Sequence, residues 1–218
     1  MRAIDFFDQI EASRAADFLK EEIQLWQAIP KIAAYIQAII PHLPADYQEI
    51  APQVWVGPGT SIERTALIQG PCIIGANCQV RHNAFVRPQV LCGDDVVIGN
   101  ATEVKNAILF DGVQVPHFNY VGDSILGYKA HLGAGAIVSN YKSTGDEIYV
   151  RVDGQRIASG TNKFGALLAD GVEVGCNSVL FPGTIVGQDS IIYPLSSVRG
   201  TIAPRTILKS DGQKYDRT

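Results

Sequence analysis

Residues 74–109 read IGANCQ-VRHNAF-VRPQVL-CGDDVV-IGNATE-VKNAIL when the chain is written in groups of six. Every group begins with an apolar residue, and the same spacing holds for ten successive positions between Val56 and Phe110. The ten are Val56, Ile62, Ile68, Ile74, Val80, Val86, Cys92, Ile98, Val104 and Phe110. A fixed short period is typical of solenoids built from stacked repeats. The sequence therefore predicts an all-β solenoid, in which each group supplies one short strand and a turn.

A second series with the same spacing covers the rest of the repeat. It consists of Leu126, Leu132, Val138, Leu168, Val174, Leu180, Val186, Ile192 and Val198. This series is shifted by four positions, so we expect irregular chain at about 111–125 to absorb the difference. Three groups make one coil of about 18 residues, with the aliphatic side chains inward and coils stacked at the usual strand spacing. An ordinary β-sandwich of alternating strands is the other interpretation, and the strict period disfavours it.

Residues 1–50 follow a helical pattern instead. The apolar residues at helical spacing are Leu19, Ile23, Trp26, Ile32, Ile36, Ile39 and Ile40, and Pro30, Pro41 and Pro44 punctuate them. We expect two or three short helices that pack on or cap the N-terminal end of the solenoid, because a bare terminal coil exposes strand edges. The expected organisation is a helical cap at 1–50, the solenoid at 51–203 with loops at about 111–125 and 139–167, and a tail at 204–218.

The composition excludes several classes of protein. A net charge of −4 and a pI of about 5.5 argue against a nucleic-acid-binding protein. No apolar run is long enough to predict a transmembrane helix, and Asp5 and Asp8 do not fit a signal peptide. We therefore expect a cytoplasmic protein without a membrane partner. The four cysteines are not spaced for stacked disulfides, which predicts free thiols.

The period also places charged residues above one another. Gln69, Arg87 and Lys105 each follow an inward aliphatic residue and are 18 positions apart, so they form one outward column. Two cations one strand spacing apart repel each other unless an anion lies between them, which favours a phosphate site. The other interpretation is a solvated pair that Glu103 neutralises.

Two interruptions of the repeat carry further candidates. The first holds His117, which could act as a general base or be an exposed or structural histidine. The second, at about 139–167, has a polar middle that predicts a hairpin of 147–152 with 156–159 around Asp153-Gly154. Loops on a rigid scaffold often carry function.

Several short motifs in a fixed order resemble those of a known family. They are Phe85-Val86-Arg87-Pro88, Glu103-Val104-Lys105-Asn106, Pro116-His117-Phe118-Asn119-Tyr120-Val121-Gly122-Asp123, Leu132-Gly133-Ala134-Gly135, Ser139-Asn140-Tyr141 and Asn162-Lys163-Phe164. Over roughly 54–200, this order resembles the C-terminal acetyltransferase domain of the bifunctional N-acetylglucosamine-1-phosphate uridyltransferase/glucosamine-1-phosphate N-acetyltransferase. Pairs such as Ile74-Gly75 and Ile98-Gly99 are similar to the repeats of hexapeptide-repeat transferases. That resemblance implies a left-handed parallel β-helix.

The resemblance implies a role for each matching residue. His117 would be the general base, and Arg87, Lys105 and Lys163 would hold the sugar phosphate. Tyr120 and Asn140 would orient the sugar, with Tyr141 beside the pocket. Acetyl-CoA, as co-substrate, would run outside the coils near Ala136, Cys176 and Pro194. No metal is implied, and the family packs as homotrimers that complete their sites between subunits.

Three departures from the family pattern limit what carries over. His131 stands where the family usually has Asn, Lys142-Ser143 follows Asn-Tyr where Asp-Gly is usual, and residues 1–50 cannot form the family's nucleotidyltransferase domain. We therefore expect a stand-alone module whose amine substrate need not be glucosamine 1-phosphate.

Three functions remain open from the sequence. The first is acetyl-CoA-dependent N-acetylation of an amino-sugar phosphate such as glucosamine 1-phosphate, as in UDP-N-acetylglucosamine biosynthesis. The second is a non-catalytic or regulatory protein that binds a sugar phosphate or sugar nucleotide. The third is a zinc hydratase, which needs three converging imidazoles. The sequence disfavours it, because the histidines are only His42, His82, His117 and His131.

Overall fold

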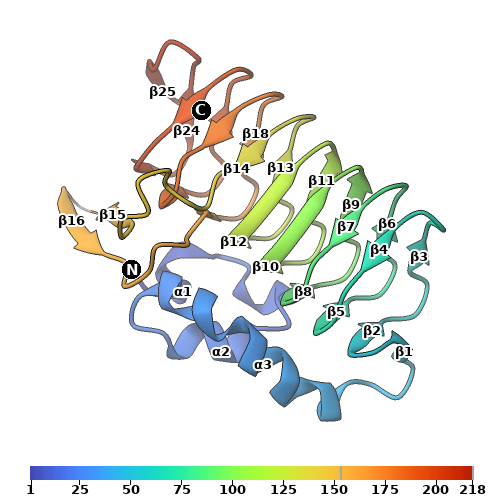
Figure 1. The fold of residues 1–218 in the computed structure, drawn as a ribbon. Helices are drawn as coiled ribbons and strands as arrows, with labels where there is room; N and C mark the ends of the chain where they lie inside the picture. The colour runs from blue at the N-terminus through green and yellow to red at the C-terminus, as the bar shows by residue number, and fades with distance from the viewer. Residues whose placement is uncertain (153, 218) are drawn as a thin grey trace.

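The computed structural model describes residues 1–152 and 154–217, and these form a parallel β-solenoid with helices packed against its side (Figure 1). The helices are α1 (Ala3–Phe6), α2 (Ala16–Glu21) and α3 (Ile32–Ile39), with 3₁₀ turns η1 (Ile10–Ala12), η2 (Leu25–Lys31) and η3 (Ile40–His42). The larger sheet contains β1 (Gln48–Ala51), β2 (Val54–Val56), β4 (Leu67–Ile68), β5 (Cys72–Ile74), β7 (Phe85–Val86), β8 (Val90–Cys92), β10 (Glu103–Leu109), β12 (Tyr120–Leu126), β14 (Ile137–Val138), β17 (Ala166–Leu168), β19 (Val179–Leu180), β20 (Thr184–Val186), β22 (Ser197–Val198) and β23 (Thr201–Ile202). The second sheet contains β3 (Ser61–Ile62), β6 (Gln79–Val80), β9 (Val97–Asn100), β11 (Gln114–His117), β13 (His131–Leu132), β18 (Glu173–Val174), β21 (Ile191–Ile192), β24 (Thr206–Leu208) and β25 (Lys214–Asp216). A separate hairpin consists of β15 (Tyr149–Val152) and β16 (Gln155–Ala158).

The period of six produces the core as expected. Val56 pairs with Ile74, and Val86 with Val104, in parallel register on successive coils. The repeating aliphatic residues are buried, apart from Ile62 and Ile68 in the first coil, which are half-buried. The expected fold class is confirmed, and the parallel pairing overturns the β-sandwich alternative.

The shift of four positions between the two apolar series does not come from a loop at 111–125, as we had expected. Stacked residues are 18 positions apart between Ala76 and Asp94, but 17 apart between Asp94 and Asp111 and between Asn106 and Asp123. The shift is therefore spread over coils that are one residue short. Most of 111–125, where we expected irregular chain, belongs to β11 and β12.

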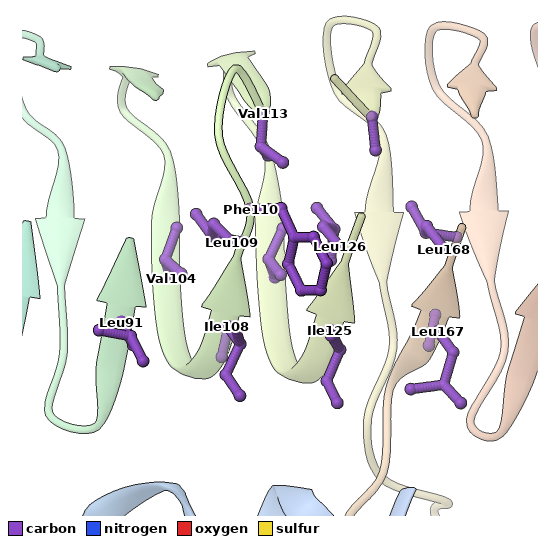
Figure 2. Close-up of a cluster of buried hydrophobic side chains, with 14 of the residues drawn as sticks. Leu91, Val104, Ile108, Leu109, Phe110, Val113, Ile125, Leu126, Leu167 and Leu168 are labelled. Carbon is purple, nitrogen blue, oxygen red and sulfur yellow. The ribbon is translucent and has the colours of Figure 1, made fainter. Parts of the chain in front are cut away.

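The shorter coil also moves one residue of the apolar series out of its column. Leu109 pairs with both Cys92 and Leu126, so it takes the stacking position that the strict period assigned to Phe110. Figure 2 shows Leu109, Leu126 and Leu168 along one row, with Phe110 labelled between the first two. Phe110 is fully buried, and its ring lies 4.6 Å from that of Phe7, centroid to centroid.

The helical segment lies along the side of the solenoid rather than over its first coil. The outward positions of β5, β8, β10, β12, β17 and β20 form an apolar stripe of Ile73, Leu91, Ile108, Ile125, Leu167 and Ile185, each at most 1% exposed. Helix α3 contacts β8 and β10, and η2 contacts β12. Figure 2 shows Ile108 and Ile125 pointing toward the helices. Burying such side chains stabilises the fold by about 2 kcal/mol each, which explains this location.

The two ends of the solenoid are each covered by an antiparallel strand. β1 pairs with β2 at the first coil, and β25 pairs with β24 at the last. An uncovered edge would offer unpaired backbone groups to another chain. These strands therefore cover the terminal strand edges, which we had expected the helices to do.

The second interruption is an excursion from the solenoid, residues 139–165. Leu168 continues the coil from Leu126, and His131 pairs with Glu173, 42 positions further along the chain. Tyr141 and Lys163 form an antiparallel bridge at its base, and its middle forms the expected hairpin of β15 and β16. Asp153, which we expected in the turn, lies outside the described residues.

Candidate functional site

A cleft of about 370 Å³ lies where the excursion leaves the solenoid, and we call it the first cleft. Arg87, Lys105 and Lys163 all line it, as do Pro88, Gln89, Asn106, Asp123 and Thr161. Ile29 and Pro30 of η2 form part of its wall. The period of six thus brings Arg87 and Lys105 together, and the excursion adds Lys163.

Asp123 is the centre of the polar network in this cleft. Its side chain is nearly buried, and its Oδ1 accepts a hydrogen bond of 2.7 Å from Asn106 Nδ2. Its Oδ2 accepts a hydrogen bond from Asn140 Nδ2 and lies 3.7 Å from Lys105 Nζ. Asn106 and Asp123 both have positive φ, 43° and 49°, which these two residue types tolerate better than most. One carboxylate thus holds side chains from β10 and the excursion.

Tyr120 and Asn140 meet across a glycine. The Tyr120 hydroxyl donates a hydrogen bond of 3.3 Å to Asn140 Oδ1. A Cβ at Gly122 would lie 2.7 Å from that hydroxyl and 3.0 Å from Asn140 Nδ2, so a side chain there would collide with both. Burial, and secondly the charge of Asp123, raises the pKa of Tyr120 above its usual value. Tyr120 is therefore a neutral donor at physiological pH.

The charges of the first cleft are partly compensated. Arg87 Nη1 lies 2.9 Å from Glu103 Oε1, which is the ion pair that the solvated-pair interpretation required. Lys105 faces Asp123. Within residues 1–152 and 154–217, Lys163 has no carboxylate partner. Three cations therefore face two carboxylates, and the third cation is the one supplied by the excursion.

His117 does not line the first cleft. It is exposed at the end of β11, in the second sheet, and Phe118 and Asn119 separate it from Tyr120. Its backbone is fixed, because its N–H donates to Asn119 Oδ1 (3.0 Å) and its carbonyl accepts from the Gly135 N–H (3.0 Å). The buried Asn119 amide in turn donates to the Gly133 carbonyl at 2.8 Å. The corner is rigid, and the imidazole stands outside the cleft.

The side chain of Tyr141 does not line the first cleft either. Its backbone pairs with Lys163, but its side chain is 47% exposed and lines a second cleft on the other side of this bridge. The bridge therefore separates Tyr141 from the residues with which the resemblance grouped it.

A third, shallow groove of about 320 Å³ lies on the outer face of the second sheet. Cys176 and Pro194, two of the positions expected near acetyl-CoA, line it. Ala136, the third, is fully buried and does not line it. His131 stands at the same groove with its Nδ1 2.7 Å from Glu173 Oε2. The side chains exposed in this groove include Ile191 and Tyr193, which suits an apolar ligand.

The cysteines differ in exposure. Cys72, Cys78 and Cys92 are buried free thiols, whereas Cys176 is exposed. Burial raises the pKa of Cys78 to about 11, so this thiol stays protonated at neutral pH. Cys176 is the thiol that a ligand in the groove would meet.

Sequence reasoning missed two residues of the network, Asp123 and Asn106. Asp123 belongs to the quoted run that contains His117, and Asn106 follows Lys105. Their stacking was hidden because they are 17 positions apart, not 18. Composition gave no signal for either residue.

The described part of the chain has neither a metal-binding cluster nor a membrane-spanning helix. Residues 1–152 and 154–217 contain no group of three or more His, Cys, Asp or Glu side chains arranged to hold a metal ion. No helix in these ranges has the length and apolar character needed to cross a membrane.

Known proteins resemble part of this chain. A profile of the GMPPB C-terminal domain matches residues 68–159. A bifunctional sugar-1-phosphate nucleotidylyltransferase/acetyltransferase of Sulfurisphaera tokodaii is 36% identical over 112 residues, which are 51% of this chain and 28% of the relative. The bifunctional protein GlmU of Methanococcus vannielii is 35% identical over 109 residues, 50% of this chain and 26% of the relative. The resemblance is therefore confirmed.

The similarity covers only part of each relative's length. The chain spans between 26% and 28% of the length of these two bifunctional relatives. Among solved structures, a mutant of AntD, an N-acyltransferase from Bacillus cereus, in complex with dTDP and coenzyme A, is 15% identical. Its alignment covers 79% of this chain and 91% of that chain, with a TM-score of 0.48.

Proposed function

We propose that this chain is a hexapeptide-repeat N-acetyltransferase that transfers the acetyl group of acetyl-CoA to the amine of an amino-sugar phosphate, such as glucosamine 1-phosphate. The observation that carries this proposal is the convergence of Arg87, Lys105 and Lys163 on one cleft beside a network of neutral donors. The similarity to bifunctional relatives named for acetyltransferase activity supports it.

Each side of the first cleft has its own part in substrate binding. The phosphate lies against Lys163, the cation without a carboxylate partner in the described ranges, with Arg87 and Lys105 beside it. Charge-assisted hydrogen bonds of this kind are the strong ones. Tyr120 and Asn140 do not line the cleft themselves, but Asn140 donates to Asp123, which does. From this position beside the cleft they orient the sugar through its hydroxyl groups, because both are neutral and already held in place.

The chemistry requires a neutral amine and a nearby thioester. The amine nitrogen attacks the acetyl carbonyl carbon, the bond between this carbon and sulfur breaks, and the coenzyme leaves as a thiolate that takes up a proton. His117 accepts the proton that the amine loses. The pantetheine arm lies in the outer groove beside Cys176 and Pro194.

The position of His117 makes assembly part of the proposal. In one chain the imidazole stands outside the first cleft, around the corner that Asn119 fixes. A homotrimer about an axis parallel to the solenoid would complete the site from two neighbouring copies. A monomeric mass in light scattering would contradict this part.

One observation favours a second function. Because His117 lies outside the cleft and Asp123 already holds Lys105, the same cleft suits a protein that binds a sugar phosphate or sugar nucleotide without catalysis.

The two functions are separated by one experiment. The full chain is mixed with acetyl-CoA and glucosamine 1-phosphate, and release of free CoA thiol is measured, with binding of the sugar phosphate followed by calorimetry. The acetyltransferase proposal expects CoA release that His117→Ala lowers by roughly a hundredfold or more, with sugar-phosphate binding retained. His82→Ala, at an exposed histidine on another coil, is the matched control and should be as active as the wild type. Binding without CoA release for a panel of amino-sugar phosphates would favour the second function.

A further inference from the structure

The edge of the solenoid that carries the first cleft continues beyond the excursion into the second cleft, of about 620 Å³. The residues that follow the inward aliphatics there are Ser139, Phe181 and Arg199, on coils that stack in register. The hairpin of β15 and β16 closes the other side, and the Thr201 hydroxyl donates a hydrogen bond to the Arg151 carbonyl. The second cleft is thus built from the excursion and the last coils.

Cations are unusually concentrated in the second cleft. Lys142, Arg151, Arg156 and Arg199 line it together with Tyr141, Tyr149 and Phe181. The guanidinium carbon of Arg199 lies 3.4 Å from the ring centroid of Phe181, and that of Arg156 lies 3.7 Å from that of Tyr149. Within the described ranges, no ion pair joins these four residues to a carboxylate.

The stacking fixes how these arginines can be used. A guanidinium group that lies flat on a ring keeps its N–H edge free, and this edge forms paired hydrogen bonds with phosphate oxygens. The ring also limits the motion of the side chain, so less conformational freedom is lost when an anion binds. Arg156 and Arg199 are therefore oriented as anion receptors from opposite sides of the cleft.

The cations lie between two surfaces of different character. Arg151, Arg199 and Gly200 also line a neighbouring cavity of about 850 Å³, on the far side of the hairpin, whose apolar lining includes Phe6 and Ile202. On the near side, Tyr141 is 47% exposed, and no cation of the described residues lies over its ring. An anion bound by these cations would thus have an open aromatic ring on one side and an apolar cavity on the other.

We propose that the second cleft binds the diphosphate group of a nucleotide, with the phosphates between Arg151, Arg156 and Arg199 and the base on Tyr141. The substituent on the far phosphate extends toward the neighbouring cavity. A sugar nucleotide and coenzyme A both contain this group. The site goes beyond the proposed acetyl transfer, because the Tyr141–Lys163 bridge separates it from the first cleft.

The test is calorimetric titration of the full chain with UDP, GDP, coenzyme A and inorganic pyrophosphate. We expect at least one of the three nucleotides to bind, and the double variant Arg151→Gln/Arg199→Gln to bind it about tenfold more weakly or worse. Tyr141→Ala should weaken the nucleotide but leave pyrophosphate unchanged, because stacking needs a base. Arg64→Gln, at an exposed arginine on the first coil that lines neither cleft, is the matched control and should leave nucleotide binding unchanged.

The arms also separate the two sources of the ligand. Loss of UDP or GDP binding in the double variant would assign the site to a sugar nucleotide, and loss of coenzyme A binding alone would assign it to the acyl donor. No binding of any nucleotide, or equal loss in Arg64→Gln, would overturn the proposal. If the double variant has a lowered melting temperature, Arg199→Lys supplies the second measurement, because it keeps the charge but not the paired N–H edge and should still weaken binding. Failure of the CoA-release assay would leave this result unaffected.

Discussion

The first and second clefts lie on one edge of the same solenoid, yet they hold their cations by different means. In the first cleft, Arg87 and Lys105 face Glu103 and Asp123. In the second, Arg156 and Arg199 lie on the rings of Tyr149 and Phe181. Carboxylates fix a cation in place but cancel part of its charge, whereas an aromatic ring orients a guanidinium group and leaves its charge available. The difference predicts a shaped pocket in one cleft and a stronger anion receptor in the other.

The largest expected effect comes from the carboxylate at the centre of the first cleft. Asp123→Ala removes the acceptor for Asn106, Asn140 and Lys105, and we expect the free energy of unfolding to fall by about 3 kcal/mol, since breaking a buried pair leaves its partners unsatisfied. Urea denaturation measures this. Glu103→Ala removes a half-exposed partner, so it should cost less than about 1 kcal/mol. Equal losses in both variants would show that burial of Asp123 does not matter.

A smaller effect is expected from the glycine between Tyr120 and Asn140. Gly122→Ala places a Cβ within 3.0 Å of both side chains, so we expect about 2 kcal/mol of destabilisation by urea denaturation. Adding Tyr120→Phe removes the nearest atom, the hydroxyl, and should restore part of the loss. A double variant that is no more stable than Gly122→Ala would place the strain elsewhere.

The raised pKa of Tyr120 gives the stability of the protein a pH dependence that arises beside the first cleft. Because the folded state holds this proton more tightly than the unfolded state, the contribution is fully present below the usual tyrosine pKa of about 10. It is lost as the pH rises through the higher pKa of the folded state. We expect the wild type to lose more stability than Tyr120→Phe between about pH 9 and about pH 11, roughly one unit either side of the usual value.

The comparison of the wild type with Tyr120→Phe isolates the contribution of this one hydroxyl group. Tyr47, whose pKa burial raises to about 12, is present in all of these proteins and cancels in the comparison. Identical urea midpoints for wild type and Tyr120→Phe over this range would contradict the assignment of Tyr120 as a half-buried neutral donor.

The smallest effect on stability is expected in the second cleft. Arg199→Gln removes an exposed guanidinium from the ring of Phe181, which we expect to cost only about 0.5–1 kcal/mol. The melting temperature measures this. A loss as large as that of Asp123→Ala would mean that Arg199 holds the last coils together, and the contrast between the two clefts would be gone.

The sequence predicted the parts of the molecule that follow from its period. Arg87 and Lys105 are together because an inward aliphatic precedes each of them on adjacent coils, and this follows from counting alone. The handedness of the coil was inferred from the resemblance, because a period of six is compatible with either hand.

The position of the helices and the polar network of the first cleft depended on packing, which the six-residue period does not determine. The helices lie along the side because Leu91, Ile108 and Ile125 point outward and are apolar, and the strict period draws attention only to inward positions. Asp123 was missed because shortened coils moved it one position relative to Asn106. The second cleft, which Tyr141 lines, was not predicted, because the resemblance gave only the order of the motifs along the chain.

The most direct test of the account compares acetylation of glucosamine 1-phosphate with acetylation of glucosamine, by CoA release, in the wild type and in Lys163→Gln. If the first cleft selects its substrate through the phosphate, the wild type has a kcat/KM for the phosphorylated sugar that is at least about a hundredfold higher. In Lys163→Gln this preference falls about tenfold or more, while the value for glucosamine stays the same. Equal preference in both proteins would contradict the claim that these cations bind the phosphate.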